Sequence, residues 1–142
     1  MKALVVYYSR GGKTRKLAET IAQELGCETI DIEKKTPDVS GVDLLIVGSG
    51  NYGGKPGKEL QKFLDNLKPT TNCKVAVFAT SGGSEPKCID VMSKALKTKS
   101  YKIISTFDCR GQMLLLNRGH PTQNDLENAK AFAGSLKKLS VK

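Results

Sequence analysis

The segment VVYYSRGGKTRK, residues 5–16, contains the change of pattern that decides the fold. Residues 2–8 form an apolar run without strict alternation, which is typical of a strand buried on both faces. A small turn with two adjacent glycines follows from Ser9, and from Thr14 onward the apolar residues recur at helical spacing until Gly26, a typical C-terminal stop. The segment therefore predicts a buried strand, a tight turn and an amphipathic helix.

The rest of the chain repeats this alternation. Apolar segments predict further strands at residues 28–33, 43–49, 73–79 and 101–109. Apolar residues at helical spacing predict further helices around residues 60–67, 89–96 and 126–136, and none between the second and third strands. This order predicts one α/β domain, residues 1–142, with a mostly parallel sheet covered on both faces. In such sheets ligands bind beyond the carboxyl ends of the strands.

Composition and charge exclude several classes of function. The chain has 142 residues, a net charge of +9, four cysteines and one histidine. No C-x-x-C pair is present, so we expect buried free thiols and neither a metal site nor disulfides. The positive charge would suit nucleic acid, but no motif for nucleic-acid binding accompanies it, and we expect none to bind. No apolar run reaches the roughly 20 residues of a membrane span and no signal cleavage site follows the first strand, so we expect a cytoplasmic protein without membrane contact.

Four glycine-bearing loops follow predicted strands and should meet at one edge of the sheet. They are SRGGKT (9–14), GSGNYGG (48–54), ATSGGS (79–84) and CRGQ (109–112). In the first loop, two hydroxyl groups flank backbone amides at the start of a helix, where the helix dipole favours an anion. Two glycines let the backbone approach a ligand closely, and three basic residues, Arg10, Lys13 and Arg15, could raise the local potential. The loop therefore predicts a site for a single phosphoryl group.

Other phosphate-binding motifs fit less well. A P-loop needs a glycine where Tyr7 stands. The segment GSGNYG, residues 48–53, matches G-x-G-x-x-G, but it follows the third strand and is interrupted at Pro56. The strand ends lack the acidic residues of response regulators, and the first loop lacks the cysteine of small tyrosine phosphatases. A cradle for a phosphate monoester remains.

The first 21 residues of this pattern, VVYYSRGGKTRKLAETIAQEL, resemble the N-terminal signature of the flavodoxins. The resemblance continues through GSGNYGGKPGKELQKFLDNL, VAVFATSGGS, FDCRGQM and GHPTQNDLENAKAFAGSL, so it extends over nearly the whole chain. It implies a three-layer sandwich of the short-chain type, with a five-stranded parallel sheet in the order 2-1-3-4-5. It also implies non-covalently bound FMN.

The resemblance assigns the loops to parts of FMN. The phosphate turn would consist of Ser9, Arg10, Gly11, Gly12, Lys13 and Thr14. The loop covering the ring near its N5 atom would consist of Ser49, Gly50, Asn51, Tyr52, Gly53 and Gly54. The pyrimidine end of the ring would be followed by Thr80, Ser81, Gly82, Gly83 and Ser84.

Three residues have more specific expected roles. Tyr52 is the aromatic residue placed to stack on the ring, and Gly53 could supply a peptide that turns over when N5 is protonated. Cys109, at the end of the fifth strand, would either contact the ring edge or be buried. The second loop lacks the second aromatic residue usual in the family, so one ring face is either open or covered by Met113, Leu114 or a partner.

The resemblance implies an electron-transfer function. We expect a monomeric carrier that exchanges electrons with redox-partner proteins, and the basic loops predict an acidic docking face on those partners. No catalytic residue is predicted, because the cofactor performs the chemistry. Two alternatives stay open: an FMN-dependent NAD(P)H or quinone reductase, and a flavin-free interaction module on the same fold.

Overall fold

The computed structural model describes residues 2–81, 86–110 and 123–140 and contains nine helices and strands within those ranges. The strands are β1 (Ala3–Tyr8), β2 (Glu28–Asp31), β3 (Leu44–Gly50), β4 (Lys74–Ser81) and β5 (Lys102–Arg110). The helices are α1 (Lys13–Leu25), α2 (Lys58–Asp65), α3 (Cys88–Thr98) and α4 (Gln123–Ser140).

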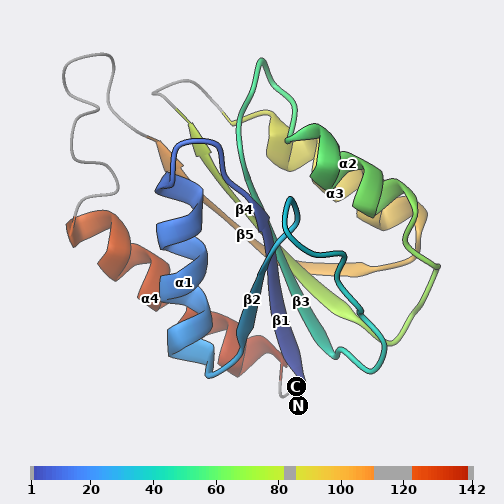
Figure 1. Cartoon of the computed structure of the whole chain (residues 1–142). Helices are drawn as coiled ribbons and strands as arrows, with labels where there is room; N and C mark the ends of the chain where they lie inside the picture. The colour runs from blue at the N-terminus through green and yellow to red at the C-terminus, as the bar shows by residue number, and fades with distance from the viewer. Residues whose placement is uncertain (1, 82–85, 111–122, 141–142) are drawn as a thin grey trace.

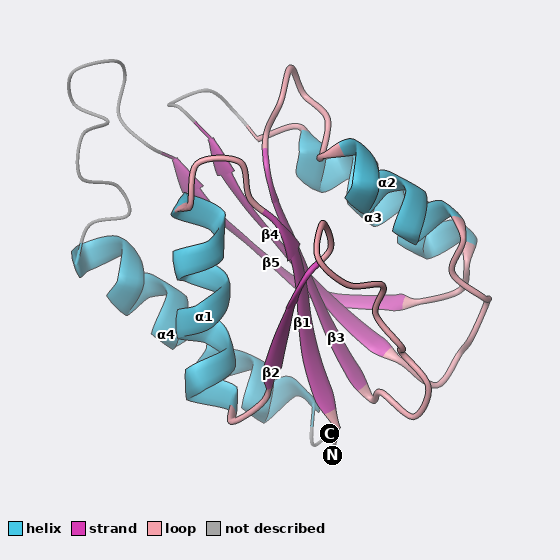
Figure 2. Cartoon of the chain, viewed as in Figure 1, coloured by secondary structure: helices cyan, strands magenta, loops and turns pink. Residues whose placement is uncertain are grey.

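All neighbouring strands are parallel, in the order β2-β1-β3-β4-β5. The predicted fold class and strand order are therefore confirmed. The chain between β2 and β3, residues 32–43, contains no helix, as the sequence indicated, and Figure 2 shows it as a loop beside the sheet. Strand β2 lies at the edge of the sheet, and its alternating sequence fits that position.

Each face of the sheet is covered by two helices, which gives three layers (Figure 1). Helices α2 and α3 pack on one face, and α1 and α4 pack on the other. Alternate residues of β1 serve opposite faces: Leu4 and Val6 belong to the first core, and Val5 and Tyr7 to the second. Because both faces are buried, β1 is apolar at every position.

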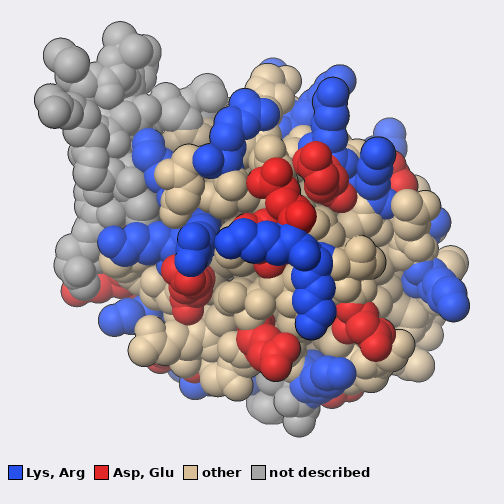
Figure 3. All heavy atoms as spheres, viewed as in Figure 1, with Lys and Arg blue, Asp and Glu red and all other residues tan. Residues whose placement is uncertain are grey.

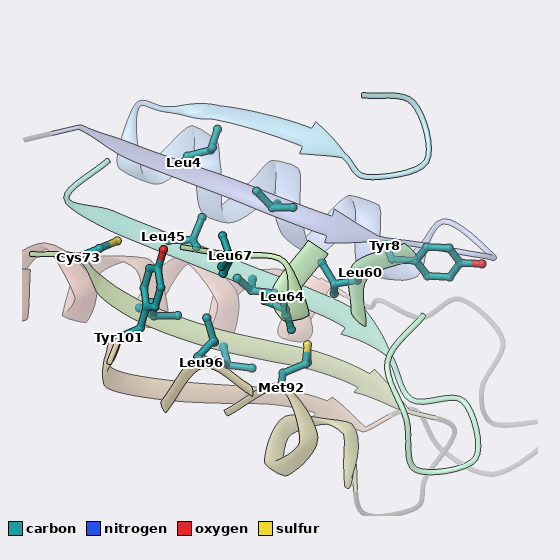
Figure 4. Close-up of a cluster of buried hydrophobic side chains, with 14 of the residues drawn as sticks. Leu4, Tyr8, Leu45, Leu60, Leu64, Leu67, Cys73, Met92, Leu96 and Tyr101 are labelled. Atoms are coloured by element: carbon teal, nitrogen blue, oxygen red, sulfur yellow. The ribbon is translucent and has the colours of Figure 1, made fainter. Parts of the chain in front are cut away.

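The core beneath α2 and α3 extends along the whole length of the strands. Figure 4 shows Cys73 and Tyr101 at one end of this cluster and Tyr8 at the other. Tyr8 lies at the carboxyl end of β1, next to the phosphate turn, so the core extends to the edge where the predicted site lies.

The end of α1 confirms the role predicted for Gly26. This glycine has a φ of +70°, and its amide donates to the carbonyl oxygens of Ala22 and Gln23. The amide of Cys27 also donates to Ala22 O at 3.0 Å, so the last carbonyls of the helix find partners in the αL stop.

All four cysteines are free thiols. Among the described residues, no group of three or more His, Cys, Asp or Glu side chains is placed to hold a metal ion. Within the same ranges, no helix has the length and apolar character needed to cross a membrane.

Candidate functional site

The predicted ligand site is a cavity at the carboxyl ends of β1, β3 and β4, with a volume of about 300 Å³. It is lined by Ser9, Arg10, Gly11, Lys13, Thr14, Gly50, Asn51, Tyr52, Thr80 and Ser81. These residues come from three of the four predicted loops, which the parallel sheet brings together at one edge. All ten were predicted site residues, and their contact with a ligand stays a prediction.

The start of α1 places amides without a helical partner beside this cavity. The first backbone hydrogen bond of α1 joins Lys16 N to Gly12 O at 3.1 Å, so the amides from Lys13 to Arg15 have no helical partner. Gly12 has a φ of +91°, and its amide donates to Ser9 Oγ at 3.0 Å. A side-chain carbon at Gly12 would meet no atom within 4 Å, so the outer side of the turn is open. Amides without a helical partner at the positive end of a helix, in an open turn, fit a phosphoryl group.

The three basic residues of this segment have different surroundings. Arg10 is exposed and lies over the ring of Tyr52, whereas Lys13 is half-buried. Arg15 forms an ion pair with Glu19 at 3.5 Å, so part of its positive charge is compensated. Arg10 and Lys13 also line the cavity, and Arg15 does not.

Two threonines connect the start of α1 to the end of β4. The hydroxyl groups of Thr14 and Thr80 are 2.9 Å apart and form a hydrogen bond. Both side chains are buried, with exposures of 2% and 9%. Thr14 lies in the first turn of α1 and was expected at its first position, but the helix begins one residue earlier, at Lys13.

Tyr52 is held from two sides. The guanidinium carbon of Arg10 lies 4.3 Å from the centre of its ring, and the Arg10 amide donates to Tyr52 Oη at 3.2 Å. The ring of Tyr8 meets it edge to face, with 5.7 Å between ring centres. Gly50 leaves room beneath, because a Cβ there would lie 2.5 Å from Tyr52 Oη. Burial raises the pKa of the Tyr52 phenol, so the group is neutral at pH 7.

A tight turn follows Tyr52. Tyr52 N donates to Lys55 O at 2.8 Å, and Lys55 N donates to Tyr52 O at 3.2 Å. The two residues between them, Gly53 and Gly54, have φ angles of +64° and +87°. Positive φ at both central positions is the type I′ geometry, which favours glycine. Nothing lies within 4 Å of a Cβ built on Gly53, so the peptide predicted to turn over lies in open surroundings.

Two predicted site residues use their side chains to hold this loop. Ser49 is fully buried; its hydroxyl donates to Gly50 O at 2.8 Å and accepts from Gly57 N at 3.1 Å. Asn51 Oδ1 accepts from Cys88 N at 3.0 Å, at the start of α3. These polar groups are engaged inside the protein and keep the loop at a fixed position above β3.

Cys109 lies opposite Thr80 in the sheet and is buried, with 6% exposure. Burial first, and then the nearby Asp125 of α4, raise the pKa of its thiol to about 12. Cys109 does not line the described cavity, and its contact with the ring edge stays a prediction. The predicted positions Gly82, Gly83, Ser84, Met113 and Leu114 lie outside the described residues.

Comparison with known proteins decides the family. A family model for the flavodoxin domain matches residues 4–116. An uncharacterized protein of Methanocaldococcus jannaschii is 38% identical over 97% of this chain and 99% of its own length. This chain belongs to the flavodoxin family.

Solved flavodoxins share the fold of this chain. The structure of a flavodoxin from the domain Archaea gives a TM-score of 0.80 at 20% identity, over 100% of both chains. The Fusobacterium nucleatum flavodoxin bound to flavin mononucleotide gives 0.74 at 14% identity, over 97% of this chain and 98% of that one. The family confirms the predicted resemblance and the predicted cofactor, FMN, and the open phosphate turn fits that cofactor.

One residue that supports the site was not predicted from the sequence. Tyr8, predicted only as part of a strand, supports the ring of Tyr52 edge to face and lies against Gly57. The available signal was its position as the last aromatic residue of the strand, directly before the phosphate turn.

Proposed function

We propose that this member of the flavodoxin family is a monomeric electron carrier that docks with its loop edge against an acidic face of a partner protein. Bound FMN supplies the redox chemistry, since it accepts and releases electrons. The chain then has to hold the cofactor, exclude water from it and present it to a partner. The described residues that line the cavity suit this, because they offer amides, hydroxyl groups and positive charge, and include no carboxylate, histidine or cysteine.

An edge of exposed lysines beside the site carries this proposal. Lys55 closes the turn after Tyr52, and Lys58 begins α2 directly after the same loop. Lys87 directly precedes α3 and lies close to the same loop, because a Cβ built on Gly54 would be 3.7 Å from the Cβ of Lys87. All three side chains are exposed, and Figure 3 shows basic side chains along the edge of the molecule where the β3–α2 loop lies. Such an edge attracts an acidic partner and speeds encounter at low salt.

Stopped-flow electron exchange with an acidic iron–sulfur protein tests the proposal. We expect fast exchange whose rate falls as ionic strength rises, because screening weakens the attraction between the two proteins. The triple variant Lys55→Gln/Lys58→Gln/Lys87→Gln should slow the exchange and flatten its salt dependence.

A matched variant controls for net charge. Lys97→Gln/Lys130→Gln/Lys138→Gln removes three exposed lysines from α3 and α4, away from the loop edge, and should leave the rate nearly unchanged. Equal effects of the two triple variants would reject docking at the loop edge. Rapid reduction of the bound flavin by NADPH, followed by transfer to a quinone, would reject the carrier in favour of a reductase.

A further inference from the structure

The hydroxyl groups of Thr14 and Thr80 form a hydrogen bond in which either group can donate, and a bound phosphate would determine which of them does. Each hydroxyl has one proton to donate and can accept through its oxygen, and at 2.9 Å one of the two donates to the other. Both residues line the described cavity, and both are at least nine-tenths buried. Their hydrogen-bonding partners are therefore restricted to the protein and the cavity.

A phosphate monoester acts almost only as an acceptor near neutral pH. Its charge at pH 7 is about −1.5 to −2, with a second pKa of about 6. A hydroxyl that touches it must donate, and its oxygen is then free to accept from a neighbour. Thr14, in the first turn of α1, is the member of the pair within the phosphate turn.

We infer that Thr80 is a positioning residue for the phosphate of FMN. Its hydroxyl donates to Thr14 Oγ1, which turns the Thr14 proton toward the phosphoryl oxygens. A hydrogen bond received by Thr14 also polarises the one that it donates. This assigns Thr80 to the phosphate half of the site, whereas the family resemblance places it along the pyrimidine end of the ring.

The main chain of Thr80 explains how this position is held. Its carbonyl accepts from Asn51 N at 2.8 Å, and its strand neighbours are Gly50 and Cys109. Thr80 is thus fixed by two strands and by the loop after β3, so its hydroxyl is a rigid donor for the first turn of α1. The inference rests on FMN binding and is independent of whether the protein carries electrons.

The test compares two ligands that differ only in the phosphate. FMN and riboflavin are titrated at pH 8 by quenching of flavin fluorescence, with Thr80→Val, Thr80→Ser and the unaltered chain. In Thr80→Val we expect the affinity for FMN to fall on the order of tenfold, because one hydrogen bond in a charge-assisted chain is lost. The affinity for riboflavin should not change, and Thr80→Ser should bind FMN like the unaltered chain.

Two further variants sharpen the comparison. In a Thr14→Val background, Thr80→Val should cause no further loss of FMN affinity, because the two residues act as one unit. Thr98→Val, which removes a hydroxyl bonded to Ala95 O at 2.7 Å on α3, should leave both affinities unchanged. Equal losses for FMN and riboflavin in Thr80→Val, or no loss for FMN, would overturn the inference.

A measurement on the unaltered chain keeps the inference falsifiable if Thr80→Val does not fold. Inorganic phosphate is titrated while the methyl and amide NMR signals of both threonines are followed. We expect the signals of Thr14 and Thr80 to shift with the same midpoint. A shift confined to Thr14 would show that Thr80 does not respond to the anion and would overturn the inference.

Discussion

Glycines at the carboxyl end of β3 and directly before α2 make room for aromatic rings. A Cβ at Gly48 would overlap the ring of Phe78 on the neighbouring strand, and one at Gly57 would overlap the ring of Tyr8. Gly50 similarly lies beneath Tyr52. Residues 48–53 match a dinucleotide-binding motif, but two of the three glycines in that match, Gly48 and Gly50, are needed for the packing of aromatic rings.

Tyr52 allows a prediction at this scale. If its ring stacks on the flavin, Tyr52→Leu should lower the affinities for FMN and riboflavin together by roughly three- to tenfold, the value of an aromatic pair beyond its buried area. Tyr52→Phe should lower them much less, because it keeps the ring and removes only the acceptor of the Arg10 amide. Fluorescence titration measures both affinities. A loss specific to FMN in Tyr52→Leu would show that Tyr52 serves the phosphate instead.

The helices differ in how their glycines are used. Gly134 lies inside α4, and a Cβ there would meet no atom within 4 Å. Gly26 ends α1 with a φ of +70°, also without neighbours within 4 Å. The space around the two is equally open, so only the backbone conformation distinguishes them.

The same substitution at these two glycines should have opposite effects. Gly134→Ala should raise the free energy of unfolding by about 1 kcal/mol, because alanine is the better helix former. Gly26→Ala should lower it by about 1 kcal/mol, because a side chain is strained in the left-handed region. Urea denaturation measures both changes in the free energy of unfolding, and the slope of that free energy against urea concentration should stay the same. A Gly134→Ala variant that is no more stable than the unaltered chain would contradict the prediction for α4.

Over the whole molecule, three of the four thiols belong to the two cores. Cys73 and Cys88 are part of the core beneath α2 and α3, and Cys109 is part of the core beneath α1 and α4. Burial raises the pKa of Cys73 to about 11, and the pKa values of Cys88 and Cys109 to about 12. The native chain therefore keeps these thiols protonated at a pH at which an exposed thiol ionises.

Stability should fall in alkaline solution for this reason. An unfolded thiol ionises around pH 9, whereas the folded thiols ionise only from about pH 11. Between these values the unfolded chain binds fewer protons than the native one, so the free energy of unfolding decreases as pH rises. Urea denaturation from pH 7 to 11 measures the decrease, which should be smaller in Cys73→Ala. Identical pH profiles for that variant and the unaltered chain would contradict the prediction.

Most of the fold could be predicted because its signals are local. Buried parallel strands appear in the sequence as unbroken apolar runs, and helices appear as apolar residues with a period near 3.6. The glycine turn between Ser9 and Thr14 can be recognised as an anion site because it stands at the start of a helix. The strand order came with the family resemblance, since an apolar run indicates burial and does not name its neighbour. The phosphate turn and the free cysteines followed from local features, whereas the ring loop, like the strand order, came with the family resemblance.

The sequence by itself thus determined the kinds of elements, the edge at which the glycine-bearing loops meet and the family. Only the tertiary structure decided which side chains meet there: Thr14 with Thr80 across 66 positions, and Tyr52 with Tyr8. It also showed that Ser49 and Asn51 turn inward to hold the loop. The physical reason is that periodicity is set by the backbone over a few residues, whereas these partners depend on strand register and close packing between segments far apart in the chain.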